Sequence, residues 1–134
     1  MNRSSAASRL LRVLPAVLYG SGIFYGGVID LGKLPETPGV PTDKLLHALV
    51  FLGFEWWIEL ALLELRTASR RVAAVGLAAL VGLGLELVQS ALPHRSGELW
   101  DFVADAVGAL LGAIVLGLLR WLVVRRPAPS ESSA

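Results

Sequence analysis

Four apolar segments dominate the pattern of hydrophobic and polar positions along the chain, at residues 13–29, 45–65, 72–92 and 102–124. A helix that crosses a bilayer needs about 20 mostly apolar residues, and these segments are of that order. The pattern therefore predicts an all-α protein, an integral membrane bundle of four transmembrane helices. We expect one membrane domain at residues 13–124, preceded by a cytoplasmic amino-terminal segment at 1–12 and followed by a disordered cytoplasmic tail at 125–134.

Basic residues are distributed unevenly among the segments that flank the apolar stretches. Nine of the 12 lysines and arginines lie before the first stretch, between the second and third, or at the end of the fourth. The other two connections, 30–44 and 93–101, hold the remaining three. Because basic residues concentrate on the cytoplasmic side, both termini are predicted to be cytoplasmic and these two connections to face outward. The protein is expected in a bacterial cytoplasmic (inner) membrane.

The first apolar stretch also fits a cleaved signal peptide, since basic residues followed by an apolar run occur in both. The run is long for the apolar region of a signal peptide, and no convincing cleavage site of small residues follows it. These features favour an uncleaved first helix.

Composition narrows the class of protein further. Charged residues make up 17% of the 134 residues, against about 25% in an ordinary soluble domain. The net charge of +1 argues against a nucleic-acid partner, because phosphate contacts need a basic surface. The chain has no cysteine, which excludes disulfides, thiolate zinc sites and cysteine nucleophiles.

Several polar residues fall near the outward ends of the predicted helices. Two pairs, Asp43 with His47 and Asp101 with Asp105, are spaced four apart and so share a helix face. Ionisable groups within a membrane are costly, and they mark functional sites by default. The alternative is that they only pair with one another and hold the bundle together. The predicted ligand-binding residues are Asp43, His47, Glu86, Gln89, Arg95, Asp101 and Asp105.

Their side chains suggest roles in binding. Arg95 is expected to clamp an anion, with Asp101 fixing it in place. Glu86 would supply an acid and Gln89 an amide. The remaining prediction is that Asp43 orients His47, which then acts as a pH-sensitive hydrogen-bond partner.

The same residues do not predict an enzyme. No serine, threonine or second histidine has a spacing that completes a nucleophilic triad with His47. A metal site would need more than one histidine and carboxylates at undiagnostic spacing, so no metal or other cofactor is predicted.

The second apolar stretch contains two further carboxyl groups, Glu55 and Glu59, which with Glu86 could supply a proton or cation path. The favoured alternative is that both face the bundle interior in protonated form, because burial disfavours a carboxylate. The adjacent Trp56 and Trp57 are expected to face lipid.

The order and spacing of the polar residues resemble the VanZ-like family across about half the chain. The motifs that carry the resemblance are Asp43-Lys44-x-x-His47, Glu86-x-x-Gln89, Pro93-x-Arg95, Asp101 and Gly108-x-x-x-Gly112. The chain departs from the family at Asp105, where asparagine is usual, and Glu55 and Glu59 are not part of the family pattern. The resemblance implies a small bacterial membrane protein of the cell envelope, in a family whose namesake is linked to teicoplanin resistance.

Three functional hypotheses follow from these observations. The first is binding of a lipid headgroup or lipoglycopeptide by the outward residues, with an influence on susceptibility to glycopeptide antibiotics. The second is a small proton-coupled transporter that uses Glu86, and the third is a structural or partner-binding membrane protein. A homodimer through the glycine-rich helix faces is compatible with all three.

Overall fold

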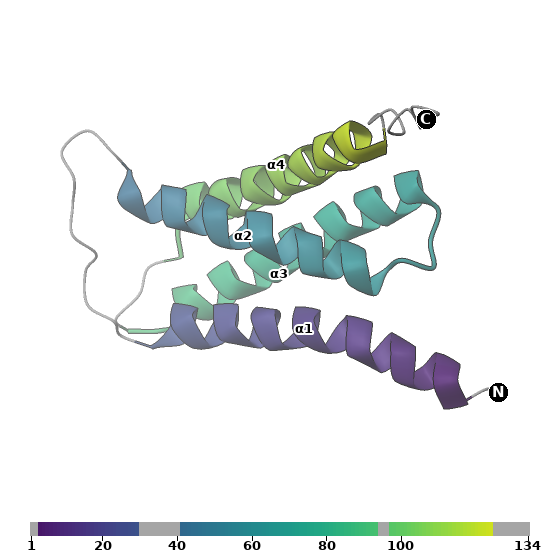
Figure 1. Ribbon diagram of the computed structural model, residues 1–134. Coiled ribbons are helices and arrows are strands. Elements are labelled where there is room, and N and C mark those ends of the chain that lie inside the picture. The colour runs from purple at the N-terminus through teal and green to yellow at the C-terminus, as the bar shows by residue number, and fades with distance from the viewer. Residues whose placement is uncertain (1–2, 30–40, 94–96, 125–134) are drawn as a thin grey trace, which may run out of the picture.

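The computed structural model describes residues 3–29, 41–93 and 97–124, with side chains described from Ala6 onward. These residues form four helices, α1 (Arg3–Val28), α2 (Thr42–Ala61), α3 (Thr67–Ser90) and α4 (Leu99–Val124). Figure 1 shows that successive helices run in opposite directions, so that α1 begins and α4 ends at the same end of the bundle. The predicted all-α bundle of four helices is confirmed.

All four helices begin before the apolar stretches that predicted them, whereas α2 ends at Ala61, four residues before the predicted end at residue 65. α1 begins ten residues before residue 13 and α3 five residues before residue 72. The added turns mix serine and arginine with alanine and leucine. A helix accommodates all of these residues, but the serines and arginines interrupt the apolar run from which the helix was predicted. The predicted carboxy-terminal tail, residues 125–134, lies outside the described residues.

Three helices are long and apolar enough to cross a membrane. They are α3, α4 and the part of α1 from Ala6–Val28. α2 is not in this group, because it carries two charged residues in its first turn and two glutamates further along. At about 1.5 Å per residue its 20 residues still span roughly 30 Å, the thickness of the hydrocarbon core. Both glutamates are fully buried, so their charges do not lie on the outer surface of the bundle.

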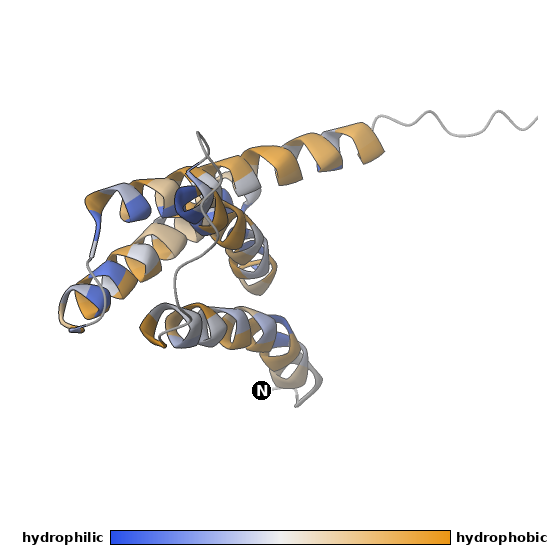
Figure 2. Cartoon of the chain, turned by 90° about the vertical axis from the view of Figure 1, so that its left-hand side faces the viewer, coloured by the Kyte–Doolittle hydropathy of each residue, from blue (hydrophilic) through white to orange (hydrophobic). Residues whose placement is uncertain are grey.

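The core forms around α2, which contacts the other three helices and touches α4 most extensively. Its buried side chains Phe51, Phe54 and Ile58 pack with small residues of α3 and α4 such as Ala78 and Ala109. Large apolar side chains on the outer faces of α3 and α4 are exposed, as contact with lipid requires. Figure 2 views the bundle from the end where α2 begins and shows hydrophilic residues there among largely hydrophobic helices.

Glycine sets the close approach of α2 and α4. A Cβ atom on Gly108 would overlap the carbonyl oxygen of Ala48 and lie 2.7 Å from its Cα atom. One turn later, a Cβ atom on Gly112 would lie 2.7 Å from the Leu52 carbonyl oxygen. This glycine-rich face of α4 therefore packs against α2. On α1, by contrast, a Cβ atom on Gly22 would contact no described atom of another helix within 4 Å.

Candidate functional site: a polar cluster at one end of the bundle

Polar side chains from α2, α3 and α4 meet at the end of the bundle where α2 and α4 begin and α3 ends. We call this set the polar cluster. It consists of Asp43, Lys44, His47, Glu86, Glu98, Asp101 and Asp105.

The centre of the cluster is a hydrogen bond between α2 and α4. The Nδ1 atom of His47 lies 2.8 Å from the Oδ1 atom of Asp105, whose side chain is fully buried. α3 makes room for this carboxyl group with Gly82, since a Cβ atom there would lie 2.8 Å from Asp105 Oδ2. The neighbouring helix thus supplies the described hydrogen bond to His47, and the prediction that Asp43 orients His47 stays a prediction.

Lys44 links the start of α2 to the start of α4. Its ammonium group lies 2.7 Å from Asp101 Oδ1 and 3.1 Å from Glu98 Oε2. Lys44 precedes the apolar part of α2, and its hydrogen bond with Asp101 raises the pKa of the ammonium group, which therefore stays charged. Asp101 also lies in the first turn of α4, where a negative charge complements the helix dipole.

Glu86 fixes the end of α3 to the residue that precedes α4. Its Oε2 atom accepts a hydrogen bond of 2.8 Å from the backbone N–H of Glu98. Gly97 permits this approach, because a Cβ atom there would lie 2.6 Å from the carbonyl oxygen of Glu86. The connection between α3 and α4 is thereby tied to a buried carboxyl group of the cluster.

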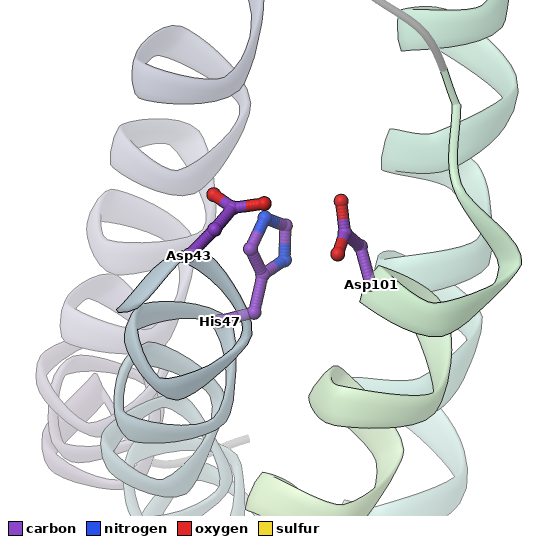
Figure 3. Close-up of side chains that lie close together, drawn as sticks. All are labelled: Asp43, His47 and Asp101. Carbon is purple, nitrogen blue, oxygen red and sulfur yellow. The ribbon is translucent and has the colours of Figure 1, made fainter. Parts of the chain in front are cut away.

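Asp43 forms the exposed rim of the cluster. Figure 3 shows its carboxylate beside the ring of His47, with the carboxylate of Asp101 facing the ring from α4. Ligand atoms of these three residues lie within 4.8 Å of one another, and the same holds for His47, Glu86 and Asp105. Both sets have the donor types and spacing to hold a metal ion.

Two predicted site residues are not placed in the cluster. Gln89 is buried on α3, but its amide N–H donates to the carbonyl oxygen of Gly27 at 3.0 Å and so ties α3 to α1. Arg95 lies outside the described residues, and with it the predicted pairing of Arg95 and Asp101. The described partner of Asp101 is Lys44.

A second polar network lies toward the opposite end of α2. The Oε1 atom of Glu59 lies 3.0 Å from Arg70 Nε and 2.6 Å from Arg120 NH1. Arg71 approaches the same oxygen at 3.8 Å. Glu59 faces the bundle interior as predicted, with one carboxyl oxygen within 4 Å of three arginines, and its predicted protonation stays a prediction. Trp56 was expected to face lipid, yet it is half-buried and donates to the carbonyl oxygen of Gly112 at 2.9 Å.

Sequence reasoning missed three residues of the site, namely Lys44, Glu98 and Gly82. Lys44 is next to Asp43 in a motif that had been recognised, so its position was available from the sequence. Glu98 participates through its carboxylate, which pairs with Lys44, and through its backbone N–H, which every residue other than proline carries. Gly82 lies four residues before Glu86 and so on the same helix face, which is the one signal that connects it to the site.

Comparison with known proteins identifies the family. The chain matches the VanZ/LLP1 family over residues 15–120, which include α2, α3, the second half of α1, most of α4 and the polar cluster. It is also 34% identical over 93 residues to the uncharacterized protein C11E3.10 of the yeast Schizosaccharomyces pombe, a match that covers 66% of this chain. The chain spans about half of that relative, 54% of its length. No solved structure matches. Because the family match extends over most of the chain, this protein belongs to the VanZ/LLP1 family.

Proposed function

We propose that this VanZ-like protein acts in the bacterial cell envelope by binding a lipid headgroup or lipoglycopeptide at the polar cluster. Binding there would influence susceptibility to glycopeptide antibiotics. The observation that carries the proposal is the convergence of polar side chains from three helices on one end of the bundle. The proposed activity is binding, without a chemical step.

The position of the cluster suits a ligand at the membrane surface. Trp100, next to Asp101, is 67% exposed, and tryptophan is enriched at the level of lipid headgroups. Asp43 is exposed at the rim, whereas Asp105 is fully buried. The cluster thus extends from an accessible edge into the bundle, which is the form expected of a pocket for a polar headgroup.

Charge distribution supports an outward orientation for this end. The opposite end carries the arginines that pair with Glu59, and also Arg9 and Arg12, both 2.9 Å from Glu64. Under the positive-inside rule the arginine-rich end would be cytoplasmic. The polar cluster would then face the outside, where envelope lipids and glycopeptides are found.

The described part of the cluster favours ligands that donate hydrogen bonds. Its carboxyl groups outnumber its single lysine, and an ionised carboxylate only accepts hydrogen bonds. Amide, hydroxyl and ammonium groups of a peptide, sugar or headgroup meet this requirement. An anionic group would instead need Lys44 or Arg95, and Asp105 makes the site more acidic than the asparagine usual in the family.

The test is teicoplanin susceptibility of a sensitive Gram-positive host that expresses the protein. Wild type is compared with an empty vector, Asp43→Asn and Arg95→Ala at matched membrane levels. Asp43 is chosen because it is exposed, so its substitution should leave the fold intact. Glu64→Gln, at the arginine-rich end, is the matched control for removal of a carboxylate.

We expect protection by wild type and by Glu64→Gln, and loss of protection in Asp43→Asn and Arg95→Ala. If well-expressed wild type gives no protection, the antibiotic part of the proposal fails. If Asp43→Asn protects as well as wild type does, the assignment of binding to the polar cluster fails.

A second candidate is a small proton-coupled transporter, favoured by the buried Glu55. Both of its carboxyl oxygens lack a hydrogen-bond partner among the described residues, as does one oxygen of Glu86. Buried carboxyl groups of this kind form proton paths in membrane proteins. Proton-driven flux in vesicles that disappears in Glu86→Gln, with headgroup binding retained, would favour transport over binding.

A further inference from the structure

Three side chains that can each supply a ligand atom to a transition metal meet inside the polar cluster. His47 comes from α2, Glu86 from α3 and Asp105 from α4, and one ligand atom of each lies within 4.8 Å of the other two. Ligands bound at about 2.0–2.2 Å from a common ion are at most roughly 4.4 Å apart. Small side-chain rotations would therefore bring these atoms to coordination distance without movement of the helices.

Unpartnered oxygens provide a second and independent observation. Within the described residues, Asp105 Oδ2 and Glu86 Oε1 are buried atoms with no hydrogen-bond partner. Asp105 is 0% exposed and Glu86 is 7% exposed. Buried polar atoms without a partner are rare in folded proteins, and each one calls for a ligand, ion or water.

The charges of the cluster indicate a cation. Lys44 is already paired with Asp101 and Glu98, so its charge is shared between two carboxylates. Neither Glu86 nor Asp105 forms an ion pair with a described lysine or arginine, and the basic partner of Asp105 is His47, one of the three proposed ligands. A buried carboxylate is costly unless it is paired or coordinates a metal.

We propose that His47, Glu86 and Asp105 form a binding site for a divalent transition-metal cation of the zinc or manganese class. One imidazole with two carboxylates suits these ions better than it suits calcium or magnesium, which prefer oxygen ligands alone. Asp43 and Asp101, which form the second set around His47, lie where they can orient the site or bind water on the ion. The proposal does not depend on the identity of the envelope ligand.

Zinc titration of the purified full-length protein in lipid nanodiscs tests this proposal. The protein carries a purification tag without histidine, is stripped with a chelator, and is titrated with Zn²⁺ by calorimetry. Bound zinc is then counted by elemental analysis after gel filtration. Asp105→Asn and His47→Gln each remove one ligand with little change in volume, and Glu64→Gln controls for a carboxylate outside the cluster.

We expect saturable binding of one ion per chain to wild type and Glu64→Gln, and at least a tenfold loss of affinity in each ligand variant. Co²⁺ gives a readout that is insensitive to adventitious surface binding, since its visible absorption should appear in wild type and change in His47→Gln. Melting of the metal-free variants shows whether they fold. If the variants do not fold, the test rests on the Co²⁺ spectrum of wild type, which must then indicate nitrogen coordination. A wild-type spectrum without nitrogen coordination overturns the proposal.

Two results would overturn the proposal directly. One is the absence of saturable Zn²⁺ and Mn²⁺ binding by folded wild type. The other is unchanged binding in Asp105→Asn and His47→Gln, which would place the ion elsewhere. Because no antibiotic or lipid ligand enters this experiment, its failure is distinguishable from failure of the proposed function.

Discussion

Gly108→Ala is the substitution that tests most directly how α2 and α4 fit together. The added methyl group would overlap the Ala48 carbonyl oxygen and lie 2.7 Å from the Ala48 Cα atom, whereas ordinary van der Waals contact begins at 3.4 Å. The helices must therefore separate by at least about 0.7 Å at this point, and by more to clear the nearer carbonyl oxygen. Both contacted atoms are backbone, so no side-chain rotation can relieve the overlap.

Overpacking of this kind costs about 1–3 kcal/mol, and a rigid backbone contact favours the upper half of that range. Alanine also gains helix propensity over glycine, by up to about 1 kcal/mol. Gly76→Ala provides the matched control, because it makes the same change within α3 at a position with no described atom within 4 Å. The propensity gain cancels between the two variants, so Gly108→Ala should be less stable than Gly76→Ala by about 2–3 kcal/mol.

The measurement is unfolding in mixed micelles by a denaturing detergent, followed by helix content. Equal stability of the two variants, within about 0.5 kcal/mol, would refute the close approach of α2 and α4. The same change should weaken the polar cluster. Gly108 lies one turn after Asp105, and Ala48 follows His47, so separation of the helices lengthens the 2.8 Å bond between Asp105 and His47.

Two further predictions concern polar contacts made by the second half of α2, at Glu59 and at Trp56. Glu59→Gln should destabilise the bundle by about 3 kcal/mol, because it leaves Arg70 buried without its carboxylate partner. Detergent unfolding measures this loss, and a loss no larger than that of the exposed Glu64→Gln, under about 1 kcal/mol, would contradict it. Trp56→Phe should cost about 1 kcal/mol, because it removes the hydrogen bond to Gly112. Unchanged stability of this variant by the same assay would exclude a contribution from that bond.

The helices were predictable from the sequence because long apolar runs between basic connections admit few other structures. Their ends were less predictable, as α1 shows by starting at Arg3 in place of residue 13. Apolar runs report the part of a helix that can lie in hydrocarbon. The polar turns beyond that part depend on hydrogen bonding within the helix and on contacts such as that of Arg12 with Glu64.

The members of the site were easier to predict than their partners. Spacing of four residues placed Asp43 with His47, and Asp101 with Asp105, on shared helix faces. It could not reveal that His47 bonds to Asp105, or that Lys44 bonds to Asp101, because these pairs cross between helices. Such pairing depends on the register of α2 against α4, which is set by the contact of Gly108 with Ala48.

The two polar networks of α2 differ in how their charges are balanced, and this difference argues for their roles. At one end, Glu59 is surrounded by arginines within 4 Å, as expected of an ion-paired group that holds three helices together. At the other end, no described lysine or arginine pairs with Glu86 or Asp105, whose described partners are a backbone N–H and His47. One oxygen of each is buried without a described hydrogen-bond partner, as is the second oxygen of Glu59. Polar contacts between membrane helices contribute only about 0.6 kcal/mol on average, too little to account by itself for burying two carboxyl groups without a basic side chain of lysine or arginine. The arginines around Glu59 are explained by stability without a ligand, whereas the polar cluster is the end of the bundle at which we propose that a ligand binds.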